Sequence, residues 1–267
     1  MRIIFFLPVF FLGLSCPLSA QNNYDFAQFK SETGLFLNQP GKWKSSNWLT
    51  VGVIGAGTVG VAQYDTAIKK NARIHAANAD SFLVQVGGQW GGFFVTPLLG
   101  FGLLTQGWAA ENEGSTKMGF EIIQAAIYAE AVSTVIKTAA GRARPGTGRN
   151  SRTYKPFSFF KSSYNSFPGG HVDAAFSLAT VLSRSTDSPV LKVLPYIPAG
   201  LTAASRVYEN AHWASDCFFG AAIGYFTAAW VMDLHEKKAK EGAGAAGLNI
   251  HPYLAGDAVG LGFTLNI

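Results

Sequence analysis

The chain has 267 residues and a formal charge of +5, and charged residues make up only 14% of it. This length suffices for one large domain with a full hydrophobic core. Soluble domains usually carry about 25% charged residues. The low share of charged residues therefore predicts wide helix-packing surfaces, contact with lipid, or both. Basic and aromatic residues do not interleave as in nucleic-acid-binding modules, which excludes nucleic acid as the expected partner.

The N-terminus is typical of a secretory signal peptide. Arg2 supplies a positive charge, residues 3–14 form an apolar core, and residues 18–20 end in an alanine that suits cleavage. We therefore expect residues 1–20 to direct export to the periplasm or to the periplasmic face of an envelope membrane. A first membrane helix and a lipoprotein anchored through Cys16 are the open alternatives.

The first half of the mature chain predicts helices separated by polar segments. Residues 21–45 are mixed in character and predict a surface segment, whereas the uncharged residues 47–64 predict a first helix. Residues 65–80 predict an amphipathic helix or an ordered connection. Residues 81–110 carry no charge and are long enough to cross a bilayer. Pro97 and several glycines predict that this segment breaks into two.

The second half continues the helical pattern. Four more segments have helical character: 118–140, 171–184, 190–204 and 212–234. Pro195 and Pro198 are expected to bend or break the third of these. The sum is an all-α domain over residues 21–240, a bundle of about six core helices.

The C-terminal residues 241–267 differ from the rest. Residues 241–247 are rich in glycine and alanine and predict a flexible linker. From residue 248 onward, apolar side chains such as Val259 and Leu261 recur at every second position, which favours strands. Because two short strands cannot close a barrel, we expect a terminal hairpin or an extended, β-like tail.

Three short clusters hold the residues suited to chemistry. They are Lys137-x6-Arg144-Pro145, Pro168-Gly169-Gly170-His171 and Ser205-Arg206-x5-His212-x3-Asp216. A phosphoryl group in transfer spreads negative charge over its oxygens, and three cations could stabilise that charge. An alternative for Lys137 and Arg144 is the ordinary preference for cations near a helix C-terminus.

Two histidines complete this inventory. His171 follows glycines at a predicted helix start, where the amide of Gly170 could approach an anion and the imidazole could protonate a leaving group. His212 and Asp216 are four residues apart, so on a helix the carboxylate could accept from one ring nitrogen and leave the other free to attack phosphorus. A plain turn at His171 and a structural pair at His212 are the alternatives. A zinc site is not expected, because the surrounding cations oppose a divalent metal.

Together and in this order, the clusters resemble the signature of the type 2 phosphatidic acid phosphatase superfamily, over about residues 137–216. Its members include membrane lipid phosphatases, soluble bacterial acid phosphatases and vanadium haloperoxidases. The resemblance implies that His212 is a nucleophile forming a phosphohistidine, that Asp216 orients it and that His171 is the general acid. It also implies that no metal or cofactor is required. The implied phosphate-binding groups are Lys137, Arg144, Arg206 and the Gly170 amide.

One position departs from the family pattern, since Gly169 stands where the signature usually has serine. A hydroxyl donor is therefore missing. The expected function is a metal-independent phosphatase that hydrolyses a phosphate monoester or diphosphate. We expect the substrate to be lipid-linked and the protein to associate with a membrane, because the segments 47–64, 81–110 and 217–232 are uncharged. The alternatives are a soluble periplasmic acid phosphatase, a vanadium haloperoxidase and a catalytically weakened phosphate-binding envelope protein.

Overall fold

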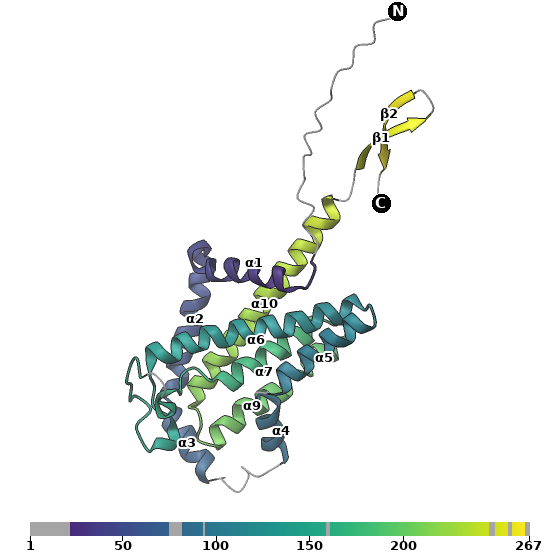
Figure 1. The fold of residues 1–267 in the computed structure, drawn as a ribbon. Helices are drawn as coiled ribbons and strands as arrows, with labels where there is room; N and C mark the ends of the chain where they lie inside the picture. Colours follow the sequence, from purple (N-terminus) through teal and green to yellow (C-terminus); the bar gives the residue numbers. More distant parts are fainter. Residues whose placement is uncertain are drawn as a thin grey trace, which may run out of the picture. The chain divides into compact units, whose positions relative to one another are not determined.

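The computed structural model describes residues 22–74, 82–92, 94–158, 161–245, 249–255 and 258–264. The expected signal peptide at residues 1–20 lies outside these ranges. Contacts divide the chain into two units, one spanning Tyr24–Leu234 and the other containing the residues from His235 onward. The first unit is built of helices and short 3₁₀ turns, which confirms the all-α expectation (Figure 1).

The elements follow one another in a simple order. In the first half they are α1 (Phe26–Leu37), the 3₁₀ turn η1 (Gln39–Lys42), α2 (Ser45–Ala62), α3 (Asp65–Ile74), α4 (Phe82–Trp90) and α5 (Val95–Ala109). In the second half they are α6 (Glu113–Ala140), η3 (Pro145–Thr147), η4 (Ser162–Tyr164), α7 (Gly170–Arg184), α8 (Pro189–Val193), α9 (Tyr196–Tyr208) and α10 (Ala214–Ala245).

Helix α1 lies within residues 21–45, for which the sequence predicted a surface segment, and most of the described residues of this segment are exposed or half-buried. The Asp25 side chain accepts from the Gln28 amide at 2.8 Å and caps the helix. The buried face of α1 is polar, because the Glu32 carboxylate accepts from Gln28 Nε2 at 2.9 Å and from Gln124 Nε2 of α6 at 2.7 Å. On either side of these polar contacts, Phe29 and Phe36 pack against the ring of Tyr128 in α6. The surface segment is therefore a helix with one packed face, which the sequence did not predict.

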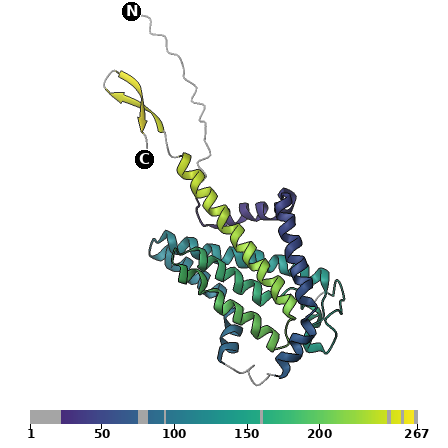
Figure 2. The same cartoon turned by 180° about the vertical axis from the view of Figure 1, so that it is seen from behind.

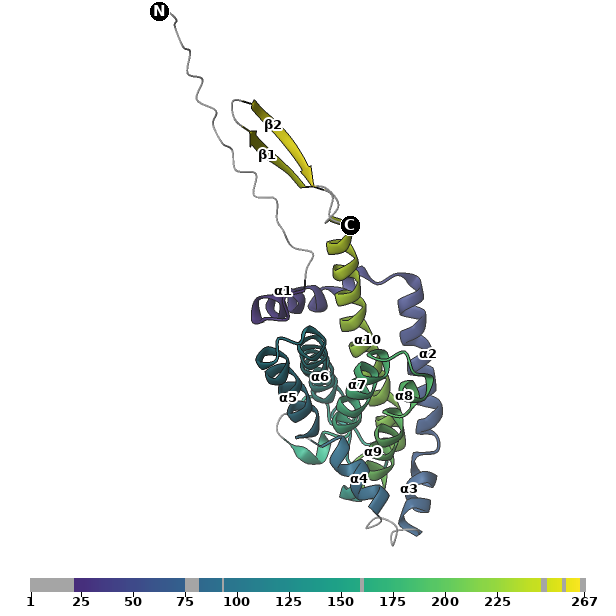
Figure 3. The same ribbon diagram turned by 90° about the vertical axis from the view of Figure 1, so that its right-hand side faces the viewer.

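The expected breaks are present in both apolar segments. The uncharged stretch 81–110 forms α4 and α5, and the stretch 190–204 forms α8 and α9, with Pro195 at the N-cap of α9. Helix α4 packs against α9, and α5 packs against α6 (Figure 3). Small residues permit this close contact, since a Cβ added to Gly87 would lie 2.3 Å from the Leu201 carbonyl oxygen.

The main hydrophobic core joins α6, α7 and α10. Its fully buried side chains include Ile122 of α6, Leu178 and Val181 of α7, and Val231 of α10. Burial of each such side chain contributes roughly 1.5 to 3 kcal/mol. These three helices carry most of the candidate site residues, so the core fixes the framework on which the site is built.

The chain after Leu234 contains the end of α10 and a hairpin. Helix α10 continues to Ala245, so residues 241–245 of the expected linker are helical. Strands β1 (Asn249–Ala255) and β2 (Ala258–Thr264) pair antiparallel, with Asn249 opposite Thr264 and Ala255 opposite Ala258. The terminal hairpin is therefore confirmed.

The ends of the core helices bring the three sequence clusters together. The loop after α6 lies beside the start of α10 (Figures 1 and 2). Backbone hydrogen bonds join these segments, from the Gly146 amide to the Asn210 carbonyl at 2.9 Å and from the Gly169 amide to the Asp216 carbonyl at 3.0 Å. Residues far apart in sequence thus meet at one end of the helical bundle.

Candidate active site

Lys137 lies near the C-terminal end of α6, which Gly141 closes in the left-handed conformation with φ of 59°. Its ammonium lies against the first turn of α7, because a Cβ added to Gly170 would be 2.4 Å from Lys137 Nζ. The same ammonium donates to the Glu130 carboxylate at 3.2 Å. Lys137 therefore faces the His171 cluster, with an exposed carboxylate as its protein partner.

Arg144 is held by backbone carbonyls. Its Nε donates to the Ser162 carbonyl at 2.9 Å and one terminal nitrogen donates to the Ala211 carbonyl at 3.3 Å. Burial lowers the pKa of Arg144, Asp216 opposes that effect, and the charge of Arg206 adds to it. Carbonyl partners orient the guanidinium without neutralising it, so its positive charge remains available to an anion.

Arg206 lies in the last turn of α9 and completes the set of three cations. Its terminal nitrogen donates to Glu209 Oε1 at 2.9 Å, and its Nε donates to the Ser205 hydroxyl at 3.3 Å. Helix α4 also reaches this point, since a Cβ added to Gly88 would lie 3.0 Å from the Arg206 terminal nitrogen. Neither Glu209 nor Gly88 was among the residues singled out from the sequence.

His171 is the second residue of α7 and its side chain is exposed on one side. Partial burial lowers its pKa, and the charges of Arg206, Lys137 and Arg144 lower it further, while Glu130 raises it. All three cations are therefore near enough to His171 for their charges to affect its pKa. The structure therefore brings together the residues that the sequence placed in separate clusters.

His212 is buried and precedes the first turn of α10. Its Nδ1 lies 2.6 Å from the carbonyl oxygen of Ser166. A carbonyl can only accept, so Nδ1 carries the proton and Nε2 keeps its lone pair. Burial and the charge of Arg144 lower the pKa of His212 to about 3, although the Ser166 carbonyl raises it. The ring is therefore neutral at physiological pH.

Asp216 does not form the hydrogen bond that we expected from its spacing. Its Oδ2 lies 3.9 Å from His212 Nδ1, because α10 begins at Ala214 and His212 is not on the helix. The carboxylate instead accepts from the Ser166 hydroxyl at 2.5 Å and from the Trp213 amide at 2.9 Å. Asp216 is thus linked to His212 through Ser166, a residue to which the sequence assigned no role.

Helix α7 begins at Gly170, and the first amides of a helix are the kind of donor that binds anions. Among the described residues, the Gly170 and His171 amides have no acceptor, as is usual in the first turn of a helix. The Gly169 amide is occupied, since it donates to the Asp216 carbonyl. The backbone does not require glycine at this position, because φ is −79° and an added Cβ would meet nothing closer than 3.4 Å.

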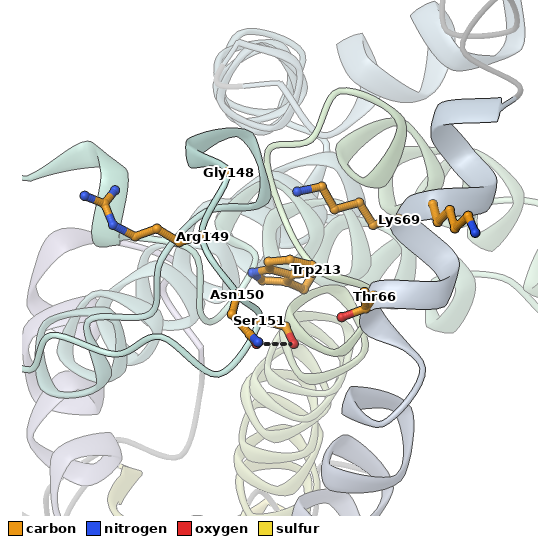
Figure 4. Close-up of a pocket in the computed structure, with 8 residues that line it drawn as sticks. Thr66, Lys69, Gly148, Arg149, Asn150, Ser151 and Trp213 are labelled. Carbon is orange, nitrogen blue, oxygen red and sulfur yellow. Dashed lines mark hydrogen bonds between the residues drawn. The ribbon is translucent and has the colours of Figure 1, made fainter.

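A hollow of about 590 Å³ lies near the site, between α3 and the loop at Gly148–Ser151. Figure 4 shows Lys69 over the Trp213 ring, while the guanidinium of Arg149 points away from it. Lys69 is held in place, 5.1 Å from the ring centroid and 2.6 Å from the Pro145 carbonyl. None of the predicted catalytic or phosphate-binding residues lines this hollow.

Comparison with known proteins agrees with this geometry. A family model described as the PAP2 superfamily matches residues 119–240, a range that contains all three clusters. This match begins in α6 and ends in α10, so the part of the chain that is similar to the PAP2 superfamily includes the helices that carry the site.

Two individual proteins are similar to parts of this chain. A lipid A 1-phosphatase from Porphyromonas gingivalis is 41% identical over 75 residues, which are 26% of this chain and 17% of that protein. The chain therefore matches about a sixth of the length of this curated relative. A solved structure, the crystal structure of Aquifex aeolicus LpxE, has 25% identity and a TM-score of 0.44, covering 58% of this chain and 85% of that one.

Proposed function

We propose that the chain is a metal-independent phosphatase that hydrolyses a phosphate monoester or diphosphate through a phosphohistidine intermediate. The observation that carries this proposal is the hydrogen bond from His212 Nδ1 to the Ser166 carbonyl. It leaves Nε2 unprotonated, which is the state that a nucleophilic imidazole requires. The similarity of residues 119–240 to the PAP2 superfamily supports the same chemistry.

The reaction follows from the placement of the groups. The Nε2 lone pair of His212 forms a bond to phosphorus while the bond to the leaving oxygen breaks, and His171 donates a proton to that oxygen. Water then attacks the phosphohistidine with His171 as base, which releases phosphate and restores His212. Lys137, Arg144, Arg206 and the free amide of Gly170 stabilise the charge on the phosphoryl oxygens in both steps.

The protonation of His171 depends on substrate binding. The three cations and partial burial lower its pKa in the free protein. A bound phosphate brings negative charge among these cations, which favours the imidazolium form. The proton needed for the leaving group is therefore taken up when the phosphate arrives, and the general acid forms where it is used.

We further propose a lipid-linked substrate and an envelope membrane as the place of action. Many large apolar side chains are exposed on α2, α5 and the α8–α9 region, among them Trp48, Val53, Leu98, Phe101, Trp108, Val190 and Ile197. Within the described residues, Glu113–Ala140 and Ala214–Gly242 are long and apolar enough to cross a membrane. The name of the Porphyromonas gingivalis relative also supports a phosphorylated lipid. In this proposal residues 1–20 direct export and residues 21–240 form the enzyme.

The test is phosphate release by purified protein with a chelator present. We expect hydrolysis of p-nitrophenyl phosphate and of a lipid phosphate in mixed micelles, with a higher kcat/KM for the lipid. His212→Ala should abolish turnover, whereas Lys69→Met, which changes a nearby cation outside the site, should retain it. Acid quenching should trap a phosphoprotein in the parent protein only. Turnover by the His212→Ala variant would contradict the assigned nucleophile.

A further inference from the structure

Arg142 lies two residues before Arg144 but has a different environment. Its side chain is 3% exposed, and its three nitrogens are all bonded within the protein. Nε donates to the Ser151 carbonyl at 2.9 Å, one terminal nitrogen to Asp216 Oδ1 at 2.5 Å, and the other to Asp65 Oδ2 at 2.7 Å. With its donors engaged and its charge buried, Arg142 is unavailable to a phosphate.

Asp65 connects this arginine to the start of α10. It is the first residue of α3, and its carboxylate is 1% exposed. It accepts from the Ser215 amide at 3.0 Å and from the Ser215 hydroxyl at 2.6 Å, across 150 residues of sequence. A carboxylate at a helix N-terminus is also favoured by the helix dipole. Asp65 therefore fixes both Arg142 and the first turn of α10.

Asp216 and Ser166 continue the connection to the histidine. Asp216 Oδ1 accepts from Arg142, while Oδ2 accepts from the Ser166 hydroxyl and the Trp213 amide. The Ser166 carbonyl in turn accepts a hydrogen bond from His212 Nδ1–H. All members of this series are buried, and each contact is of hydrogen-bond length. The series runs from α3 to His212 without a gap.

We propose that Asp65 and Arg142 are positioning residues that hold His212 in its reactive tautomer, acting through Asp216 and Ser166. The kinetic part of this inference rests on the proposed function, in which His212 is the nucleophile. Neither Asp65 nor Arg142 touches the substrate. Their role is to fix the Ser166 carbonyl as the acceptor for Nδ1–H, since a ring with its proton on Nε2 has no lone pair at the attacking nitrogen.

Changes to the outer members should therefore act on the histidine. Asp65→Asn removes the charge that holds one side of the Arg142 guanidinium, and the remaining contacts let Asp216 and Ser166 shift. Ser166→Ala removes the hydroxyl contact to Asp216 but keeps the carbonyl that faces His212. Because small misplacements of a reacting group cost up to roughly 100-fold in rate, both variants should lower kcat by about 10- to 100-fold, with KM nearly unchanged.

A matched control separates positioning from general loss of stability. Glu32 is a fully buried carboxylate of α1 that accepts from Gln28 and Gln124, away from this series. Glu32→Gln and Asp65→Asn should both lower the melting temperature, but Glu32→Gln should keep kcat per folded molecule. If Asp65→Asn and Ser166→Ala retain as much kcat as Glu32→Gln, the positioning role is overturned.

A spectroscopic measurement tests the inference without turnover. The ¹⁵N shifts of His212, assigned by comparison with His212→Ala, report which ring nitrogen carries the proton. The parent protein should show the Nδ1–H form, and Asp65→Asn or Ser166→Ala should populate the Nε2–H form. An unchanged tautomer in both variants would overturn the inference, whether or not the parent protein is active. If the tautomer shifts as expected but the parent protein shows no turnover, only the proposed function is contradicted.

Discussion

The two sets of cations in this site differ in how the protein holds them. Arg142 is enclosed by carboxylates and is 3% exposed, whereas Lys137 and Arg206 are 16% and 13% exposed and each pairs with a carboxylate that is itself about half open to solvent. Within the described part of the chain, the partners of the Arg144 guanidinium are backbone carbonyls. The first arrangement fixes a geometry, and the second leaves charge that a phosphate can reach. Arg142 lies between Lys137 and Arg144 in the sequence, so the different surroundings of these cations come from the fold and not from their place in the chain.

The largest expected effect distinguishes these two roles. Arg142→Met leaves Asp65 and Asp216 buried without their shared partner, and breaking a buried ion pair costs about 3 to 5 kcal/mol. We expect a large fall in the free energy of unfolding, measured by urea denaturation followed by circular dichroism. Arg142→Lys should recover part of the loss, since it restores the charge but not the geometry of three nitrogens. A Met variant as stable as the parent would contradict the assignment of Arg142 to a structural cluster.

Arg206→Met should show the opposite pattern. Its pair with Glu209 is partly exposed, so its loss should cost less than about 1 kcal/mol of stability. Loss of one stabilising donor should nevertheless lower kcat/KM by roughly 100- to 1,000-fold. Equal losses of stability in Arg142→Met and Arg206→Met would remove the distinction between the two sets.

The same variant tests the electrostatics of His171. Turnover needs neutral His212, which has a pKa of about 3, and a proton on His171, whose pKa in the free protein lies below its ordinary value of 6.5. Uptake of that proton with the phosphate becomes harder above the pKa of the free protein. The plot of kcat/KM against pH should therefore peak in acid and fall as pH rises through the lowered pKa of His171. Removing the Arg206 charge raises that pKa, so the alkaline limb should move to higher pH in Arg206→Met. A limb that stays in place would mean that another group controls it.

Part of this site could be predicted from sequence. The three clusters have fixed local spacings, so the sequence was enough to predict their residues and their positions near helix ends. The breaks in the apolar segments could be predicted from their prolines and glycines. The Asp65–Arg142 pair was not, because 77 residues separate its members and only the tertiary fold joins them. The sequence feature that could have pointed to this pair was Arg142, an additional arginine inside the first cluster. The His212–Asp216 contact was misjudged because helical spacing was applied to a residue that precedes the helix.

A smaller effect concerns the departure at Gly169. Its φ of −79° suits any residue, and an added Cβ would lie 3.4 Å from the Asp216 carbonyl and from Val172. Gly169→Ser should therefore fold normally and place a hydroxyl at the first turn of α7, beside the bound phosphate. We expect a severalfold rise in kcat/KM from one added hydrogen bond to a charged group. Gly169→Ala is the matched control, and an equal effect of both changes would assign the gain to backbone restriction instead.

The smallest expected effect comes from the carboxylates that pair with the exposed cations. Glu209 and Glu130 occupy donors of Arg206 and Lys137, so a phosphate must compete with them. Glu209→Gln and Glu130→Gln should each lower the inhibition constant of vanadate by a few fold, in keeping with exposed pairs worth less than about 1 kcal/mol. The two differ in one respect, because Glu130 raises the pKa of His171. Only Glu130→Gln should move the alkaline limb of kcat/KM to lower pH. An equal shift in both variants would mean that Glu209 also raises the pKa of His171, which would contradict this distinction.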